Sequence, residues 1–169
     1  MFVEGKLHRT IKASSDLTRV TIIDQTTLPF EFKLIDLKSL EDVIQAIKLM
    51  QVRGAPLIGV TSAYGIALAM NKNSSDQSLM RAAASLKESR PTAVNLTWAV
   101  NQMLEHLKGY DFSRRANLAW HYANQLAEED IKTNKDIGKA GLLLLKEIKR
   151  VPLNILTHCN AGWLATIDH

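Results

Sequence analysis

The chain has 169 residues, of which 46% are hydrophobic and 22% charged, and its formal net charge is +4. This composition excludes an intrinsically disordered chain and predicts a globular protein with a sizeable core. The lysines and arginines are scattered, mostly singly, whereas a nucleic-acid site gathers its cations on one face. We therefore predict no nucleic-acid partner and interpret the positive charge as solvated surface, with attraction for an anionic substrate as the alternative.

Neither membrane insertion nor secretion is expected. The long uncharged stretch over residues 55–71 is shorter than the roughly 18 to 20 apolar residues that a membrane span needs, and it contains polar side chains. Charged residues interrupt the first ten positions, which argues against a secretory signal. We expect no membrane partner and a cytoplasmic protein.

Residues 10–35 have the alternation of short strands. The pattern predicts strands over residues 10–13, 19–24 and 30–35, the last with Phe30, Phe32 and Leu34 on one face. Pro29 and a polar stretch over residues 14–16 separate them. We predict a small antiparallel sheet or a pair of hairpins.

Helical spacing dominates from residue 39 to residue 148. Ser39 can cap a helix whose apolar residues recur up to Met50, and a buried helix follows with Pro56 in its first turn, where no backbone N–H needs a partner. Further helices are predicted from residue 75 to 87, from Pro91 to Gly109, and from about 111 to 148, the last with Gly138 and Gly141 as points where it could break. The chain is therefore predicted to be mainly α with a small amino-terminal antiparallel β element.

Residues 153–157 form a short, uncharged run of β type that leads into a loop around Cys159. A strand that enters a loop in this way is typical of the ligand-binding edge of an α/β sheet. We therefore divide the chain into an amino-terminal β-hairpin plus helical domain, residues 1–150, and the start of a truncated Rossmann-like domain, residues 151–169.

Two places combine a cation with the start of a helix. Arg53 and Gly54 precede the buried helix, and Arg90 precedes the helix that carries Asn95. The first turn of a helix exposes backbone N–H groups and a partial positive charge, which suit a phosphate or a carboxylate. Both patterns also have an explanation without a ligand. The first would be a turn glycine beside a surface arginine, and the second a capped helix with Pro91 in its first turn.

The third place is the single cysteine, Cys159, at the carboxyl end of the predicted strand. A thiol near hydrogen-bond donors and a cation can have a lowered pKa and act as a base or nucleophile, and buried filler is the alternative. His158 points to the other face of a strand, so no Cys-His pair is implied. The five histidines show no zinc-ligand spacing with Cys159, and we expect no metal.

In their order and separation, four segments resemble methylthioribose-1-phosphate isomerases. They are Asp24-Gln25 with Leu28-Pro29, residues 52–56, residues 90–96, and residues 157–162. The resemblance runs from about residue 19 to residue 166 and favours functional roles for Arg53, Arg90 and Cys159.

The resemblance implies a homodimeric enzyme of methionine salvage that interconverts 5-methylthioribose 1-phosphate and 5-methylthioribulose 1-phosphate without an external cofactor. A helical amino-terminal domain and a Rossmann-like carboxyl-terminal domain would hold the substrate between them. Cys159 and a later aspartate would carry the isomerisation, by proton or by hydride transfer. The implied substrate-binding residues are Arg53, Gly54, Ala55, Arg90, Asn160 and Gly162. The sequence ends before such an aspartate, so we expect the 169-residue chain to be inactive alone.

Other readings stay open. Ribose-1,5-bisphosphate isomerases share the segments around Arg53 and Cys159, although Gly162 and residues 90–96 argue against them. A preference for 5-deoxyribose 1-phosphate is equally compatible with the sequence. The related regulatory subunits of the translation-initiation exchange factor bind ligands without isomerase chemistry, and the retained Cys159 argues against that class. A folded helical domain with no activity of its own is the fourth reading.

Overall fold

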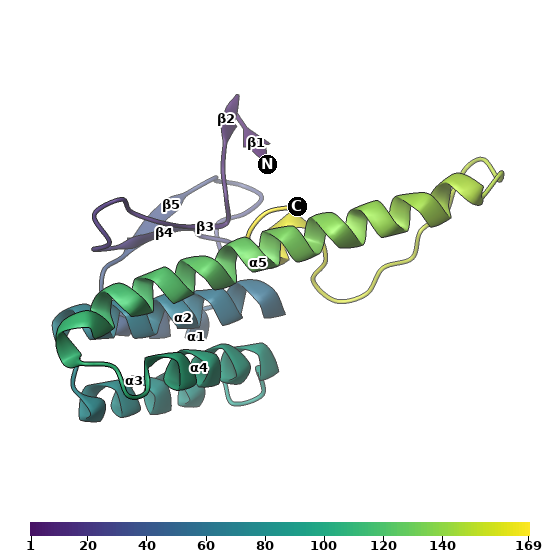
Figure 1. Ribbon diagram of the computed structural model, residues 1–169. Coiled ribbons are helices and arrows are strands. Elements are labelled where there is room, and N and C mark those ends of the chain that lie inside the picture. Colours follow the sequence, from purple (N-terminus) through teal and green to yellow (C-terminus); the bar gives the residue numbers. More distant parts are fainter.

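Two small antiparallel sheets precede a bundle of helices in the computed structural model, which describes residues 1–169 (Figure 1). The strands are β1 (Phe2–Val3), β2 (Lys6–Leu7), β3 (Ile11–Ala13), β4 (Val20–Ile23) and β5 (Leu34–Leu37). The first two form a hairpin, and the other three form a sheet in the order β3-β4-β5, with Ile22 opposite both Ile11 and Ile35. The predicted antiparallel element is confirmed.

The third strand lies later in the chain than the alternation predicted. Residues 26–31 form a turn in which the N–H groups of Phe30 and Glu31 both donate to the carbonyl of Thr27, at 3.1 and 3.0 Å. These N–H groups are therefore hydrogen-bonded within the turn and do not pair with β4. The prediction of a strand from residue 30 is wrong, and Phe30 is 96% exposed.

Five α-helices follow, close to the predicted ranges. They are α1 (Leu40–Lys48), α2 (Ala55–Lys72), α3 (Asp76–Ser89), α4 (Val94–Leu107) and α5 (Phe112–Glu147). The predicted cap of α1 is confirmed, because the Ser39 hydroxyl accepts from the Asp42 N–H at 3.1 Å and the Asp42 carboxylate accepts from the Ser39 N–H at 3.0 Å.

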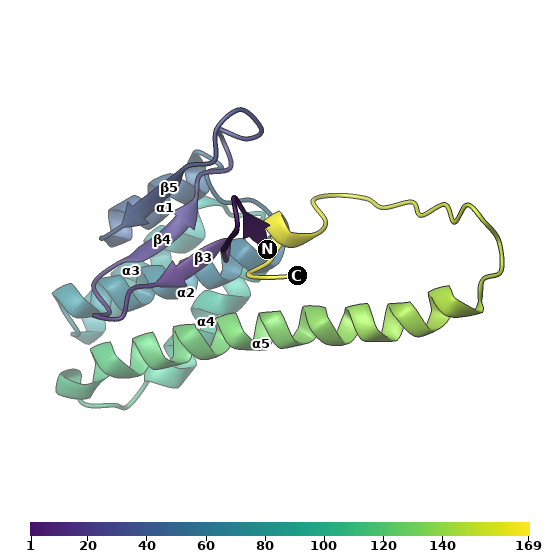
Figure 2. The ribbon, with the colours of Figure 1, turned by 90° about the horizontal axis from the view of Figure 1, so that it is seen from above.

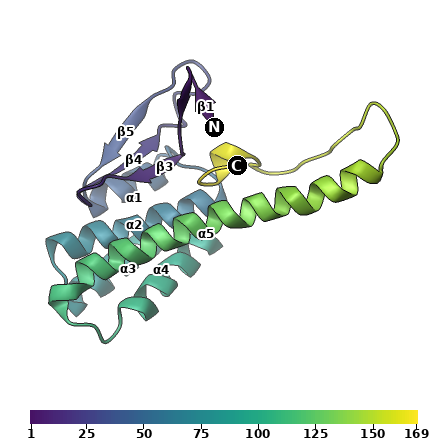
Figure 3. The same ribbon diagram turned by 45° about the horizontal axis from the view of Figure 1, so that its top comes forward.

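Helix α2 is the centre of the molecule. Every residue from Leu57 to Met70 is buried, as expected for a helix that is apolar on all sides. It packs against α1, α3, α4 and α5, while the three-stranded sheet lies above the bundle (Figure 3). In Figure 1, α2 and α4 run in the same direction and α5 runs the opposite way. The amino-terminal ends of α2 and α4 therefore meet at one end of the bundle.

A buried arginine links two segments of the chain at the opposite end of the bundle. Arg115 is only 2% exposed, and its guanidinium donates to the carbonyls of Ser74 at 2.7 Å and Tyr110 at 3.0 Å. It also forms an ion pair with Asp76 at 2.8 Å. One side chain thus joins the start of α3 to the loop that precedes α5.

The distal half of α5 extends away from the bundle (Figure 2). The helix is continuous through Gly138 and Gly141, and no residue between Ile131 and Ala165 is buried. An exposed loop then returns the chain to a short 3-10 helix, η1 (Trp163–Ala165). No helix of the structure combines the length and the apolar character that a membrane span requires.

The strand predicted over residues 153–157 is not formed. The segment has no ladder hydrogen bonds, and Ile155 and Leu156 are 71% and 98% exposed. A strand of a parallel sheet is stabilised by its neighbours on both edges and both faces, and no such neighbour lies beside this segment. The Rossmann-like continuation stays a prediction.

Candidate functional site

The amino-terminal end of α2 is shaped by Gly54. This residue is the N-cap of the helix, with φ of +93°, a backbone conformation that L side chains rarely adopt. Pro56 lies in the first turn, as predicted, and Arg53 is the exposed residue of the connection just before the helix. The N–H groups of Ala55 and Leu57, in the first turn of α2, have no acceptor within the helix, and Arg53 closely precedes them.

Asp24 holds this connection in place. Its carboxylate accepts from the N–H and hydroxyl of Thr26, at 3.0 and 2.6 Å, and from the side-chain amide of Gln51 at 3.0 Å. Burial raises the pKa of Asp24, but the hydrogen bonds from Thr26 and Gln51 outweigh it, so the pKa lies below its ordinary value. The end of β4 is thereby joined to the residues that lead into Arg53.

Arg90 lies at the end of α3 and not in the first turn of α4. Its Nη1 atom is buried and has no hydrogen-bond partner. A buried N–H of a charged group is costly when it is unpaired, so an orphan of this kind calls for a specific explanation. It sits in the short connection that leads to the amino-terminal end of α4, which begins at Val94.

The ends of α2 and α4 approach each other closely. A Cβ placed on Gly59 would lie 3.1 Å from the carbonyl oxygen of Asn95, in the first turn of α4. A hollow of about 430 Å³ lies beside this contact and is closed on its third side by α5. Its lining comes from Pro56, Gly59 and Val60 of α2, Asn95, Trp98 and Ala99 of α4, and Leu126, Glu129, Asp130 and Thr133 of α5.

The loop that carries Cys159 is anchored at the same end of the bundle. Ala165 of η1 packs against Gly54 so closely that a Cβ on Gly54 would lie 2.4 Å from its Cα atom. The side-chain amide of Gln25 donates to the Leu164 carbonyl at 2.7 Å. Cys159 precedes Ala165 by six residues, which limits its Cα atom to about 22 Å from this anchor.

The thiol itself is free. Cys159, Asn160 and Gly162 are all exposed, and Cys159 has a φ of +63°, which is uncommon for a residue with a side chain. The structure thus brings the ends of α2 and α4 together and anchors the segment after Cys159 beside them, but it does not place the thiol against Arg53 or Arg90. No three His, Cys, Asp or Glu side chains are placed together to hold a metal ion.

Sequence reasoning assigned no role to Asp130. Its carboxylate accepts from the N–H of Ile167 at 2.9 Å, and burial raises its pKa, with the bond from Ile167 acting in the opposite direction. The available signal was a carboxylate followed by Ile131 on the apolar face of a helix, where a charge needs a partner.

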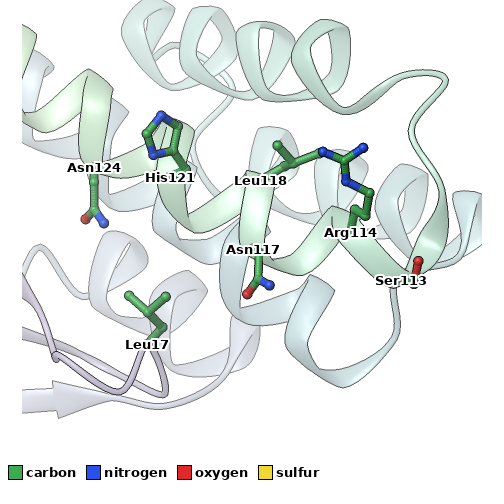
Figure 4. A pocket seen from close by; sticks show the side chains of 7 residues that line it. All are labelled: Leu17, Ser113, Arg114, Asn117, Leu118, His121 and Asn124. Carbon is green, nitrogen blue, oxygen red and sulfur yellow. The ribbon is translucent and has the colours of Figure 1, made fainter.

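A second hollow, of about 550 Å³, lies at the other end of the bundle (Figure 4). It is lined by side chains from the first turns of α5, including His121 and Asn124, and by Leu17 from the turn between β3 and β4. None of the three places singled out by the sequence contributes to it, so it is separate from the candidate site.

Comparisons with known proteins agree on one family. Residues 51–167 match the model of the initiation factor 2 subunit family. The chain is 50% identical to the methylthioribose-1-phosphate isomerase of Methylorubrum populi, over 99% of this chain and 47% of that protein.

Two solved structures share the fold. The 5-methylthioribose 1-phosphate isomerase of Pyrococcus horikoshii aligns with a TM-score of 0.80 and 38% identity, over 96% of this chain and 46% of that one. Subunit delta of the translation initiation factor eIF-2B from A. fulgidus aligns with a TM-score of 0.80 and 36% identity, over 96% and 48%. The chain spans about half the length of the curated relatives it matches.

Proposed function

The chain belongs to the initiation factor 2 subunit family, and from that premise we propose that it is the substrate-binding half of a methylthioribose-1-phosphate isomerase. The reaction moves one hydrogen from C2 to C1 of the sugar and turns the aldose 1-phosphate into a ketose 1-phosphate. Atoms and electrons balance within the substrate, so the reaction needs no external oxidant or reductant.

The observation that carries this proposal is the meeting of two helix amino-terminal ends beside an unpaired arginine. The amino-terminal parts of α2 and α4 lie in contact through Gly59 and Asn95, and the buried Nη1 of Arg90 lacks a partner. Helix amino-terminal ends and guanidinium groups are the usual ligands of phosphate oxygens. A phosphate at this end would satisfy donors that the chain itself leaves open.

We propose the binding roles from this arrangement. Arg53 and the N–H groups of Gly54 and Ala55 bind the phosphate at the start of α2, and Arg90 neutralises it from the side of α4. Asn160 and Gly162, in the loop anchored beside α2, contact the sugar.

Cys159 is the proposed catalytic residue. A thiolate near the arginines and the helix ends is stabilised by their positive charge and can take the proton from C2. An aspartate from the other half of the enzyme, kept protonated by an apolar environment, acts as the acid partner. A hydride route would use the same two groups to hold the hydroxyl protons.

The proposed assembly is a homodimer in which residues 151 onward begin a Rossmann-like domain and the substrate lies between the two domains. A phosphorylated sugar does not cross an apolar bilayer, since a charge is costly there. We therefore place the enzyme in the cytoplasm, in methionine salvage.

A chimera tests the proposal directly. The chain is joined to the second half of the Methylorubrum populi enzyme, and turnover of 5-methylthioribose 1-phosphate is measured. Cys159→Ala should lower kcat by at least about a thousandfold. Arg90→Gln should raise KM by about ten- to a hundredfold, while the exposed Arg81→Gln on α3 serves as the matched control. Unchanged turnover in Cys159→Ala would refute the catalytic assignment.

A second candidate is a non-catalytic, ligand-binding subunit. It is favoured by the equal TM-score of 0.80 to subunit delta from A. fulgidus, since the fold alone does not separate the two classes. A folded chimera that binds the sugar phosphate with Arg90-dependent affinity but shows no turnover would support this candidate. Parallel assays on ribose 1,5-bisphosphate and 5-deoxyribose 1-phosphate separate the possible substrates.

A further inference from the structure

We propose that Asp130 is a positioning residue that holds the loop of Cys159 at the amino-terminal end of α2. The catalytic meaning of this placement rests on the proposed function, whereas the placement itself does not. Asp130 lies on α5, far from Cys159 in the sequence, and touches neither Arg53 nor Arg90 through any hydrogen bond.

The segment after the loop returns to the bundle through a small number of contacts. Ile167 is fully buried, its N–H donates to Asp130 at 2.9 Å, and its carbonyl accepts from the N–H of Thr10 at 3.1 Å. Two residues earlier, Ala165 packs against Gly54. Asp130 and Thr10 thus hold both backbone groups of Ile167, two residues beyond the end of η1.

Asp130 links the segment after Cys159 to the hollow between α2, α4 and α5. Its carboxylate accepts the bond from Ile167, and the residue also lines the hollow between α2, α4 and α5, to which Pro56 and Asn95 contribute. The residues between Ile148 and Gly162 are exposed and make no hydrogen bond that would position the loop from its other end. The position of Cys159 relative to α2 is therefore set by the residues that follow it. Leu164 is held by Gln25, and Ile167 is held by Asp130 and Thr10.

The bond to Ile167 requires only an oxygen acceptor at the right distance. A side-chain amide has nearly the same shape as the carboxylate and can accept the same bond, whereas a methyl group cannot. The proposal therefore distinguishes Asp130→Asn, which should keep the loop in place, from Asp130→Ala, which should release it.

The test uses the 169-residue chain without any sugar phosphate. Cys159 is the only cysteine, so a nitroxide label can be attached there and its broadening of the Gly54 and Ala55 amide signals measured by NMR. In Asp130→Ala this broadening should fall at least about twofold, and hydrogen exchange of the Ile167 amide should accelerate about tenfold. Asp130→Asn should restore both values, and Asp136→Ala, an exposed carboxylate on the same helix, should change neither.

Three results would overturn the proposal: unchanged broadening and exchange in Asp130→Ala, the same loss in Asp130→Asn as in Asp130→Ala, or equal acceleration of every core amide, which would mark a purely structural role. Asp130→Leu, which has no hydrogen-bond acceptor in its side chain, replaces the alanine variant if that variant does not fold. In the active chimera, Asp130→Ala should lower kcat about tenfold with less than a twofold change in KM. A chimera that is inactive with Asp130 intact would count against the proposed function, while the NMR results still decide the positioning.

Discussion

Replacing Gly54 by alanine tests the packing on which the candidate site depends. A Cβ at this position would lie 2.4 Å from the Cα of Ala165 and 2.6 Å from its carbonyl oxygen. These are backbone atoms, so no side-chain rotation relieves the overlap. The chain must either move η1 away from α2 or distort the start of the helix.

The expected loss has two parts. An L residue with φ near +93° costs about 1–2 kcal/mol in backbone strain. Displacing η1 also exposes Ile167, whose accessible fraction is 0%, and burial of such a side chain contributes about 1.5–3 kcal/mol. Gly54→Ala should therefore lower the free energy of unfolding by about 3–4 kcal/mol, if the relaxed structure recovers part of the contacts.

Gly109→Ala is the matched control. Gly109 also has a positive φ, of +79°, but a Cβ there would meet no atom within 4 Å. The control should therefore lose only the strain, about 1–2 kcal/mol. Urea unfolding of both variants, monitored by tryptophan fluorescence, measures the difference. If Gly54→Ala costs no more than Gly109→Ala, then η1 is not packed against α2 as described.

Three further predictions concern the rest of the molecule. The pKa of Asp24 is lowered below 3.8 in the folded state. Its contribution to stability is therefore fully present above that value and is lost as the pH falls through the lower, folded-state pKa. Asp24→Asn should make the free energy of unfolding depend less on pH in this acid range, and an unchanged dependence would contradict the prediction. Arg115→Met should lower the free energy of unfolding by about 2–3 kcal/mol because two loop carbonyls lose their donor. Arg114→Met, at an exposed position, should have little effect. Equal losses of the two variants in urea unfolding would refute the stabilising role of Arg115. Replacing Gly138 and Gly141 by alanine should stabilise the distal half of α5 by about 0.5–1 kcal/mol for each residue and slow its hydrogen exchange accordingly, since neither Cβ would meet another atom within 4 Å. A kink or faster exchange would show that the glycines are needed.

The helices were predictable because their signals are local. Ser39 and Ser75 cap α1 and α3 with their side chains, and Pro56 marks the first turn of α2. The apolar spacing in α4 places Leu96, Val100 and Met103 on the buried face, as expected. Each signal is complete within a few residues and needs no knowledge of the rest of the fold.

The strands were harder to place because their stability comes from partners distant in sequence. The alternation around Phe30 suits a strand, but the N–H groups of Phe30 and Glu31 bond to the Thr27 carbonyl within a turn and are not available to a neighbouring strand. Residues 153–157 have strand composition as well, yet they have no neighbour with which to pair. Composition reports what a segment could form, and pairing decides whether it does.

The candidate site was predictable in its parts and not in its arrangement. Arg53, Arg90 and Cys159 could be selected from the sequence because their residue types suit phosphate binding and proton transfer. The link between them could not, because it depends on the fit of Gly54 against Ala165 and on the bond from Ile167 to Asp130. Neither pair produces a recognisable spacing in the sequence, because the two residues of each pair are distant in the chain. They meet only through the packing of α2 and α5. The sequence shows that Gly54 and Asp130 are present. Only the folded chain shows that Ala165 packs where the glycine lacks a side chain and that Ile167 donates to the carboxylate.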